Sequence, residues 1–288
     1  MASSRSSSSQ PDSAQPTPAA AAAVPSRLAA EHLRLSYDSR VVADDLSVTI
    51  PDGGFTVIIG PNACGKSTLL KALSRTLKPE AGAVLLDGQP ISSYRSRTVA
   101  RELAMLPQSP IAPEAMTVTD LVSRGRYPHQ GLLRQWSADD ERAVGAAMAS
   151  TGITDLAARY VTELSGGQRQ RAWIAMVLAQ ETELLLLDEP TTFLDIAHQY
   201  EVLELCGALH EEGRTLVAVL HDLNQAARYA TNLIVMKAGQ IVATGKPQDV
   251  VTAELIEDVF GLPCVIMTDP EAGTPMVIPR LKGAARAL

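Results

Sequence analysis

The stretch Gly60-Pro61-Asn62-Ala63-Cys64-Gly65-Lys66-Ser67-Thr68 decides the fold of this chain. Two glycines bracket four residues and are followed by Lys-Ser, which is the phosphate-binding loop pattern. Residues 55–59 before it are apolar and largely β-branched, as in a buried strand, and residues 68–73 favour a helix. A glycine-rich loop between a strand and a helix directs its backbone N–H groups into one anion-binding concavity. The sequence therefore predicts an α/β core with a phosphate site.

Two side chains of this loop carry the predicted chemistry. Lys66 would reach the outer phosphates of a nucleotide as a point charge, and Ser67 would offer its hydroxyl to Mg²⁺. The competing interpretation is a plain glycine-containing turn with a surface lysine. The strand and helix on either side of the loop disfavour that interpretation.

Composition narrows the class of protein. The chain has 288 residues, a 46% apolar fraction and a net charge of −7, so it can bury a sizeable core and lacks the basic surface typical of nucleic-acid binding. Its three cysteines, Cys64, Cys206 and Cys264, have no metal-binding spacing and suit a reducing compartment. No apolar stretch has the length of a membrane span. We expect a soluble protein, or one held at a membrane by another chain.

The chain divides into regions of different composition. Residues 1–26 are mostly Ser, Ala and Pro, which predicts a disordered tail rather than a signal peptide. Residues 27–245 carry the α/β pattern, and helical signals replace strand signals at about 109–163, which indicates an inserted helical subdomain. Residues 246–288 read as an extension of the same domain, with a helix at 251–260 and a hairpin within 262–279.

A run of four leucines, Leu184 to Leu187, predicts a parallel strand buried on both faces. It ends in Asp188 and Glu189, at the edge of the sheet where the phosphate loop also ends. There Asp188 is placed to hold Mg²⁺, and Glu189 to orient or deprotonate a water molecule. Two solvated acids at a strand end are the alternative, which the buried strand disfavours.

Other candidate residues leave two interpretations open on their own. Tyr37 ends a strand, where it could stack on a purine or be an ordinary half-buried tyrosine. His221 ends the strand at 215–220 and could contact a γ-phosphate or be structural. A helix is predicted from Arg169 to about Gln180, directly after Ser165-Gly166-Gly167-Gln168. This segment could bind a phosphate or be a plain helix cap. The loop 125–129 is a polar, aromatic segment or a solvated connection.

These motifs stand in one order that resembles the ATP-binding subunit of an ABC transporter, over about residues 27–243. The pentapeptide Leu164-Ser165-Gly166-Gly167-Gln168 ahead of the acidic strand is the most specific of them. The resemblance implies a P-loop NTPase core of the RecA-like kind, with an antiparallel β subdomain and the inserted α-helical subdomain. It also implies ATP and Mg²⁺ as ligands.

The resemblance assigns roles around one ATP. Tyr37 matches the aromatic residue that stacks on adenine, and Gly60 to Thr68 match the Walker A loop. Gln108 matches the Q-loop residue that contacts Mg²⁺ and the attacking water. Asp188 matches the Walker B residue on Mg²⁺, and Glu189 the catalytic base. One departure is Ala63, where many members have glycine, and we expect nucleotide binding to survive it.

The resemblance also implies that each site is shared between two subunits. Ser165, Gly166, Gly167 and Gln168 match the signature that binds the γ-phosphate of ATP held by a second copy. Asp195 matches the D-loop residue and His221 the switch histidine. We therefore expect a head-to-tail homodimer on the cytoplasmic face of the membrane, bound to a separate transmembrane permease. An extracytoplasmic substrate-binding protein would be an indirect partner.

Three stretches resemble the ferric siderophore group of bacterial importers: 125–129, 190–199 and 269–279. Phe193 and Ile196-Ala197-His198-Gln199 are its most specific residues. Haem and cobalamin importers belong to the same group and are the alternative. A non-transport ABC protein fits less well, because it would carry two cassettes or long heptad coils. We expect an ATPase that powers ferric siderophore import.

Overall fold

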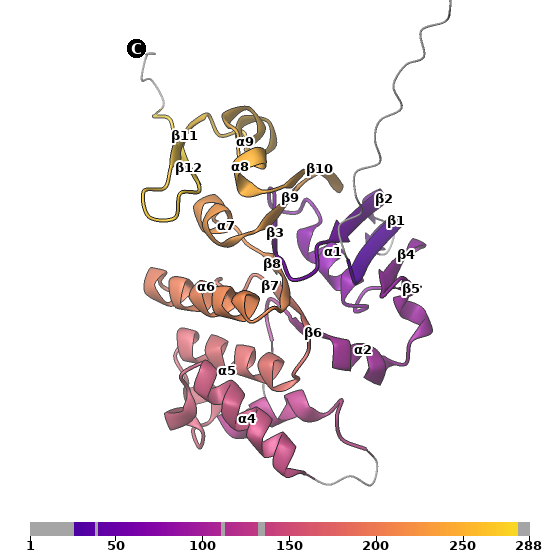
Figure 1. The fold of residues 1–288 in the computed structure, drawn as a ribbon, viewed down its shortest axis with the longest axis vertical. Helices are drawn as coiled ribbons and strands as arrows, with labels where there is room; N and C mark the ends of the chain where they lie inside the picture. Colours follow the sequence, from indigo (N-terminus) through magenta and orange to yellow (C-terminus); the bar gives the residue numbers. More distant parts are fainter. Residues whose placement is uncertain (1–25, 38–39, 111–112, 132–135, 282–288) are drawn as a thin grey trace, which may run out of the picture.

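The structure is a computed structural model that describes residues 26–37, 40–110, 113–131 and 136–281. The predicted tail at 1–26 lies outside these residues except for Ser26, and residues 282–288 of the predicted extension also lie outside them. Two large β-sheets lie side by side, and helices cover the larger one (Figure 1).

The larger sheet has six strands in the order β10-β9-β3-β8-β7-β6. Five of them run parallel, and β10 pairs antiparallel with β9 at one edge. Every residue of β3, β7 and β8 is buried, which explains their unbroken apolar sequences. The strands are β3 (Phe55–Ile59), β6 (Leu103–Leu106), β7 (Leu184–Asp188), β8 (Thr215–Val219), β9 (Asn232–Lys237) and β10 (Gln240–Gly245).

The second sheet is antiparallel, with the order β2-β1-β4-β5. Helix α1 (Lys66–Leu73), which follows the phosphate loop, packs against it and begins two residues before the predicted start. The sheet comprises β1 (Leu28–Tyr37), β2 (Arg40–Ile50), β4 (Ala81–Leu86) and β5 (Gln89–Pro90). An α/β fold with a parallel core and an antiparallel sheet is therefore confirmed.

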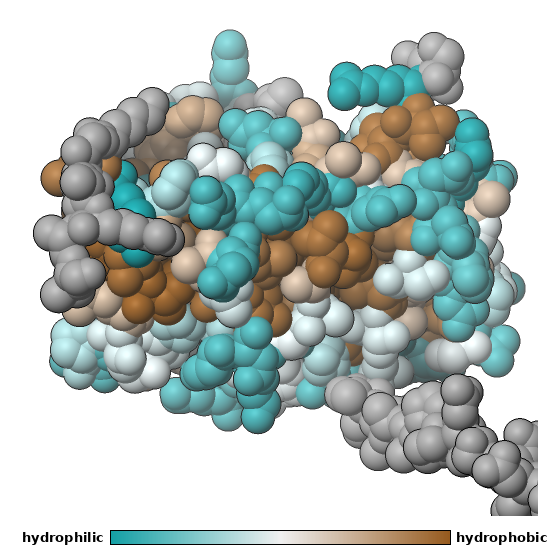
Figure 2. All heavy atoms as spheres, turned by 90° about the horizontal axis from the view of Figure 1, so that it is seen from above, coloured by the Kyte–Doolittle hydropathy of each residue, from teal (hydrophilic) through white to brown (hydrophobic). Residues whose placement is uncertain are grey.

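The parallel strands separate two hydrophobic cores. Side chains alternate across a strand, so Leu185 and Leu187 of β7 enter one core and Leu184 and Leu186 the other. The second core also includes α1 and the antiparallel sheet, which fixes the phosphate loop between the two sheets. From above, Figure 2 shows brown apolar residues gathered in a band between polar ones.

The described parts of 109–163 contain helices and turns but no strand longer than a single bridge. Helices α3 (Val118–Ser123) and α4 (Ala138–Ser150) pack on α5, the helix after the signature. The predicted start of α5 at Arg169 is wrong, because the helix spans Gly166–Ala179 and Ser165 caps it. Short 3-10 turns lie at Ile91–Ser93, Arg124–Arg126, Thr154–Leu156 and Val161–Glu163.

Four helices were not anticipated from the sequence: α2 (Ser96–Glu102), α6 (Ile196–Glu211), α7 (Leu223–Tyr229) and α8 (Pro247–Val250). The helix expected at 251–260 is confirmed as α9 (Ala253–Phe260), which begins two residues later than predicted. The later start follows from Thr252, whose hydroxyl accepts from the Leu255 N–H and caps the helix. The hairpin β11 (Cys264–Thr268) and β12 (Pro275–Pro279) packs on α7. None of the described helices is long and apolar enough to cross a membrane.

Candidate active site

The phosphate loop needs glycine where the backbone turns left-handed or meets a neighbour. Gly65 has φ 108°, and a Cβ on Gly60 would lie 2.2 Å from the carbonyl oxygen of Met236. Ala63 adopts φ 61°, a conformation that costs an alanine more than a glycine. The buried Lys66 donates from Nζ to the carbonyl oxygens of Gly60 (2.8 Å) and Pro61 (3.0 Å). Its ammonium group is thus held inside the loop.

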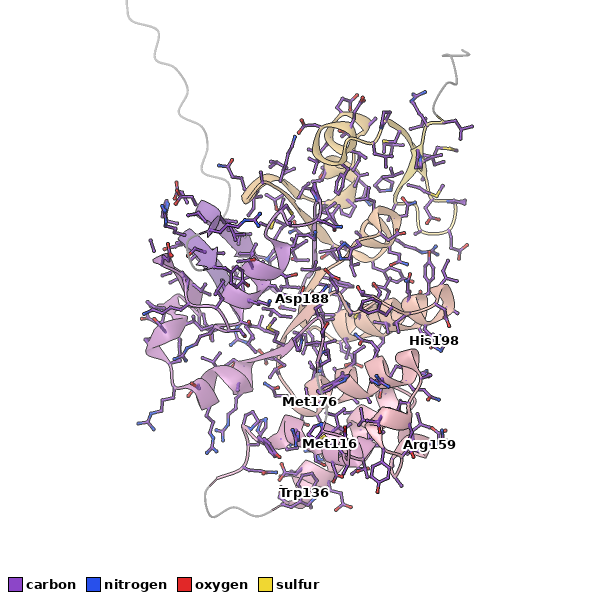
Figure 3. The ribbon with its side chains drawn as sticks, turned by 180° about the vertical axis from the view of Figure 1, so that it is seen from behind. Met116, Trp136, Arg159, Met176, Asp188 and His198 are labelled. Atoms are coloured by element: carbon purple, nitrogen blue, oxygen red, sulfur yellow. The ribbon has the colours of Figure 1, made fainter. Side chains whose placement is uncertain are left out.

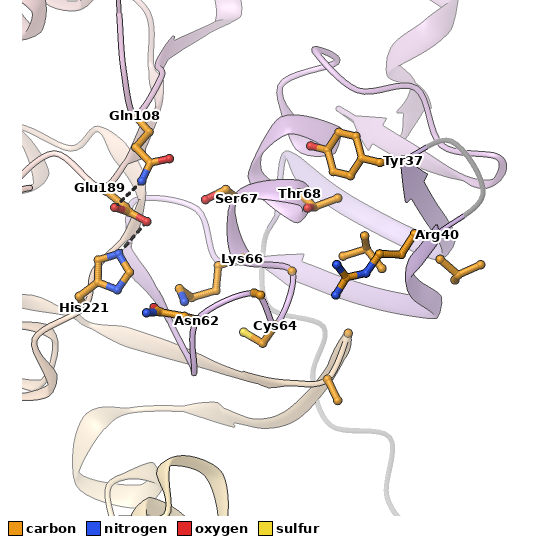
Figure 4. Close-up of a pocket in the computed structure, with 16 residues that line it drawn as sticks. Tyr37, Arg40, Asn62, Cys64, Lys66, Ser67, Thr68, Gln108, Glu189 and His221 are labelled. Carbon is orange, nitrogen blue, oxygen red and sulfur yellow. Dashed lines mark hydrogen bonds and ion pairs between the residues drawn. The ribbon is translucent and has the colours of Figure 1, made fainter.

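A cavity of about 770 Å³ opens above this loop, between the two sheets (Figure 4). Tyr37 of β1 lies at one end, and Gln108, Glu189 and His221 lie at the other, with the loop residues 62–68 along the floor. The structure therefore brings together predicted residues that are far apart in the chain. Of the residues predicted around one ATP, Gly60, Pro61 and the buried Asp188 do not line the cavity.

The turn between β9 and β10 also lines the cavity, although no motif pointed to it. The Gly239 N–H donates to the Cys64 carbonyl at 2.9 Å. A Cβ on Gly239 would lie 2.0 Å from the Val42 carbonyl oxygen, so only glycine fits between the loop and β2. Arg40, Val41 and Val42 line the cavity beside Tyr37 and were likewise not anticipated.

Ser67 and Asp188 form a centre that fits a hard cation. The Ser67 hydroxyl donates to Asp188 Oδ1 at 2.7 Å, and the buried Asp188 Oδ2 has no hydrogen-bond partner among the described residues. Burial raises the pKa of the Asp188 carboxyl, the hydrogen bond from Ser67 opposes this, and nearby Glu189 adds to it. Hydroxyl and carboxylate oxygens are the protein ligands that Mg²⁺ prefers. Both residues thus fit Mg²⁺.

Ser67 and Asp188 would supply only part of the coordination of Mg²⁺. The described residues contain no group of three or more His, Cys, Asp or Glu side chains able to hold a metal. Mg²⁺ is usually held by one or two carboxylates together with substrate phosphates, which agrees with a site at a phosphate loop.

Glu189 lies at the centre of a hydrogen-bond network. Its Oε1 lies 2.6 Å from His221 Nε2, and its Oε2 accepts from Gln108 Nε2 at 2.7 Å and from Thr192 Oγ1 at 3.1 Å. Burial alone would raise the pKa of Glu189, but these contacts hold it below its ordinary value. Its backbone adopts φ 53°. The carboxylate is ionised and oriented toward the cavity, and Thr192 is a partner that the sequence analysis missed.

The signature and the D-loop lie apart from this cavity in the same chain. None of Ser165, Gly166, Gly167, Gln168 and Asp195 lines it. Ser165 accepts from the Gln168 N–H, and Asp195 caps α6 at its start. A Cβ on Gly167 would lie 2.8 Å from the ring of His198, so the two motifs pack together. Figure 3 shows His198 on α6 toward the edge of the molecule and Asp188 near its middle.

The loop 125–129 is not a solvated connection. Arg126 is 4% exposed, and its guanidinium donates to Asp140 Oδ1 (2.9 Å), the Ala179 carbonyl (2.8 Å) and Glu181 Oε2 (2.7 Å). A Cβ on Gly125 would lie 2.2 Å from the Met176 carbonyl oxygen. Gly125 and Arg126 therefore join α4 to the end of α5, whereas Tyr127 of the same loop is exposed.

A family model described as ABC transporter matches residues 43–192. The chain belongs to the ABC transporter family. Solved ABC transporter structures share its fold. A metal-chelate type ABC transporter in an inward-facing conformation has a TM-score of 0.76 and 30% identity, covering 89% of this chain and 98% of that one. A dimeric bacterial ABC transporter cassette has a TM-score of 0.68 and 25% identity, covering 76% and 98%.

Curated ABC transporter relatives are similar over nearly their whole length. The ferric enterobactin transport ATP-binding protein FepC of Escherichia coli (strain K12) is 59% identical over 254 residues, covering 88% of this chain and 94% of FepC. The petrobactin import ATP-binding protein FpuD of Bacillus anthracis is 54% identical, covering 89% and 94%. The hemin import ATP-binding protein HmuV of Thermobifida fusca (strain YX) is 41% identical, covering 88% of each chain. The expected ABC transporter membership is confirmed.

Proposed function

We propose that this chain hydrolyses ATP to power the import of a ferric siderophore through a separate membrane permease. The observation that carries the proposal is the Glu189 carboxylate, oriented by Gln108 and His221 at the edge of a cavity built on a phosphate loop. Similarity at 59% identity to a ferric enterobactin subunit supports the choice of cargo, since the haem-importer relative is 41% identical.

The residues predicted from the sequence have the following roles in this reaction. Tyr37 offers its ring to adenine, and the loop N–H groups and Lys66 bind the phosphates. Ser67, Gln108 and the buried Asp188, which accepts from Ser67, would hold Mg²⁺. Mg²⁺, when bound, neutralises charge that develops on the phosphate oxygens. Glu189 accepts a proton from the water that attacks the γ-phosphoryl group, and His221 keeps Glu189 oriented. The chemistry is mainly positioning and charge stabilisation.

The complete site is formed by two copies of the chain. The signature residues Ser165 to Gln168 lie outside their own cavity, so they are available to the ATP of a second copy. Beside Asp195, the apolar side chains of Phe193 and Ile196 are 89% and 72% exposed, as expected of a surface that another chain covers. The structural likeness to a dimeric cassette agrees with this arrangement.

The membrane partner would contact the region that follows Gln108. A hollow of about 540 Å³ lies there, lined by the exposed aromatic residues Tyr127 and Trp136. We place the ATPase domain at 27–245, with its helical subdomain at about 109–163 and an extension at 246–288. The chain would act at the cytoplasmic face of the membrane, and an extracytoplasmic substrate-binding protein would deliver the cargo to the permease.

Uptake of labelled cargo in a strain that lacks this subunit tests the proposal. The parent chain should restore uptake of a ferric siderophore, and Lys66→Ala should not, because it removes the ammonium that reaches the phosphates. Lys78→Ala, outside the cavity, is the matched control and should restore uptake fully. Restoration of haem or cobalamin uptake in place of siderophore uptake would contradict the assigned cargo.

A further inference from the structure

A chain of two glutamine side chains links the D-loop to α7. Gln199 Nε2 donates to the Leu194 carbonyl oxygen at 3.1 Å, one residue before Asp195. Gln225 Nε2 donates in turn to Gln199 Oε1 at 2.8 Å. Gln225 is only 5% exposed, and neither glutamine lines the nucleotide cavity. These contacts therefore serve something other than direct binding of the nucleotide.

The Leu194 carbonyl decides which atom donates in both of these hydrogen bonds. The Leu194 carbonyl can only accept a hydrogen bond, so Gln199 must present its amide nitrogen there. The Gln199 oxygen then faces Gln225, which must donate. The partners therefore fix the orientation of both amides.

The other end of the chain reaches the catalytic carboxylate. Asp222 Oδ1 accepts from the backbone N–H of Gln225 at 2.8 Å, and Asp222 directly follows His221. His221 contacts Glu189, and the Thr192 hydroxyl donates to the same Glu189 side chain. Through the backbone from Thr192 to Leu194, these hydrogen bonds close into a ring around the segment 189–194.

We propose that Gln199 and Gln225 are positioning residues that couple His221 in the nucleotide cavity to Leu194 and Asp195 in the D-loop. The inference rests on the proposed function, in which a second copy of the chain contacts the D-loop. A displacement of His221 moves Asp222 and the first turn of α7, which Asp222 caps. Gln225 lies in that turn, so the two glutamines transmit the displacement to the Leu194 carbonyl.

The variants Gln199→Met, Gln225→Met and the double variant test this coupling in the purified full chain. Methionine keeps the length and apolar volume of glutamine but has no N–H donor. We expect each single variant to lower kcat roughly three- to thirty-fold and to reduce the cooperativity of hydrolysis in ATP. Binding of ATP should be unchanged, because the cavity keeps all its lining side chains. The double variant should be no slower than the slower single variant, since both break one chain.

Gln180→Met is the matched control. Gln180 also donates from its side-chain amide to backbone carbonyls, those of Ala100 and Leu103, but at the end of α5. It should lower thermal stability without changing kcat or cooperativity. If Gln225→Met fails to fold, Gln199→Met still tests the coupling, because Gln199 is only half-buried. The same fall in kcat is expected there.

Three results would overturn the inference alone, and a fourth would overturn it together with the proposed function. Parental kcat and cooperativity in Gln199→Met would show that the link carries no coupling. Additive losses in the double variant would show two independent effects. A loss of the same size in Gln180→Met would show a general effect of stability. A parent chain without ATPase activity would overturn the proposed function together with this inference, before any variant is compared.

Discussion

Two clusters of charged side chains in this molecule tie together segments that are far apart in sequence. One surrounds Arg126 in the helical region, and the other surrounds Glu189 and Asp188 at the nucleotide cavity. Arg126 is buried, and Asp140, Glu181 and a backbone carbonyl satisfy its guanidinium. In the second cluster, the buried Asp188 Oδ2 has no partner among the described residues.

This difference in hydrogen bonding distinguishes a cluster that stabilises the fold from one that binds a ligand. A buried polar group costs free energy unless it is hydrogen-bonded, so a satisfied cluster needs nothing from outside the chain. An unsatisfied buried oxygen beside an open cavity indicates that a ligand supplies the missing partner. Removing Arg126 should therefore affect stability before activity, and removing Glu189 should affect activity before stability.

The largest expected effect is on catalysis. Glu189→Gln keeps the shape of the side chain but cannot accept a proton from water, so ATP turnover should fall roughly 10²–10⁴-fold. ATP binding should persist, and the ATP-bound dimer should accumulate, measurable by size-exclusion chromatography. The control is Glu183→Gln, at the opposite end of β7 and exposed. Turnover at the parental rate in Glu189→Gln would show that Glu189 is not the base.

The Arg126 cluster should respond in the opposite way. Arg126→Met leaves the buried Asp140 without its cation, which should lower the free energy of unfolding by about 3–5 kcal/mol. Denaturant titration measures this loss, and ATP binding of the folded fraction should be unchanged. Arg124→Met, exposed on the same turn, should change stability by no more than about 0.5 kcal/mol. Equal losses in the two variants would contradict the comparison.

Acid should reduce the advantage of the parent over Arg126→Met. Burial raises the pKa of Asp140, but hydrogen bonds from Arg126 and Ser137 outweigh it and hold the pKa below its ordinary value. A carboxyl with a depressed pKa stabilises the fold above its unfolded pKa of about 3.9, and this stabilisation is lost as the pH falls through the folded pKa. The stability difference should therefore shrink below about pH 4. A constant difference down to acid unfolding would refute this origin.

The smallest expected effect concerns the phosphate loop itself. Because Ala63 has φ 61°, Ala63→Gly should relieve strain and stabilise the chain by about 0.5–1 kcal/mol. Ala146→Gly, at an exposed position inside α4, should destabilise the chain by a similar amount. Thermal unfolding of both variants measures the two signs. A loss of stability in Ala63→Gly would mean that the loop gains nothing from glycine there.

The sequence predicted the buried parallel strands, because a strand buried on both faces leaves an unbroken apolar run that ends at the ligand-binding edge of the sheet. Leu184 to Glu189 is the clearest case. The sequence contained no sign of Arg40, Val41, Val42 or Gly239 in the cavity lining. The start of α5 was placed too late because Gly166 and Gly167 are poor helix formers, whereas the Ser165–Gln168 capping box favours the earlier start. The burial of Arg126 could not be predicted from its polar neighbours in sequence. It depends on partners such as Asp140, which is 14 residues away.

The contacts of Thr192 and the Gln199–Gln225 chain could not have been read from sequence. They depend on how the segment after β7 folds back over Glu189 and on the position of α7 beside it. Neither position follows from local propensity. Gln199 was noted only as part of a family motif, and neither Thr192 nor Gln225 gave a signal of its own.

Gly239 fixes the spacing between the antiparallel sheet and the phosphate loop. Its backbone packs in the gap between the Val42 carbonyl of the antiparallel sheet and the Cys64 carbonyl of the phosphate loop, where a Cβ would not fit. Tyr37 belongs to the sheet on one side of that gap, and Lys66 to the loop on the other. A molecule that engages both must span this fixed interval. Adenine alone or inorganic phosphate alone can contact only one of the two, so the cavity selects its ligand by length as well as by charge.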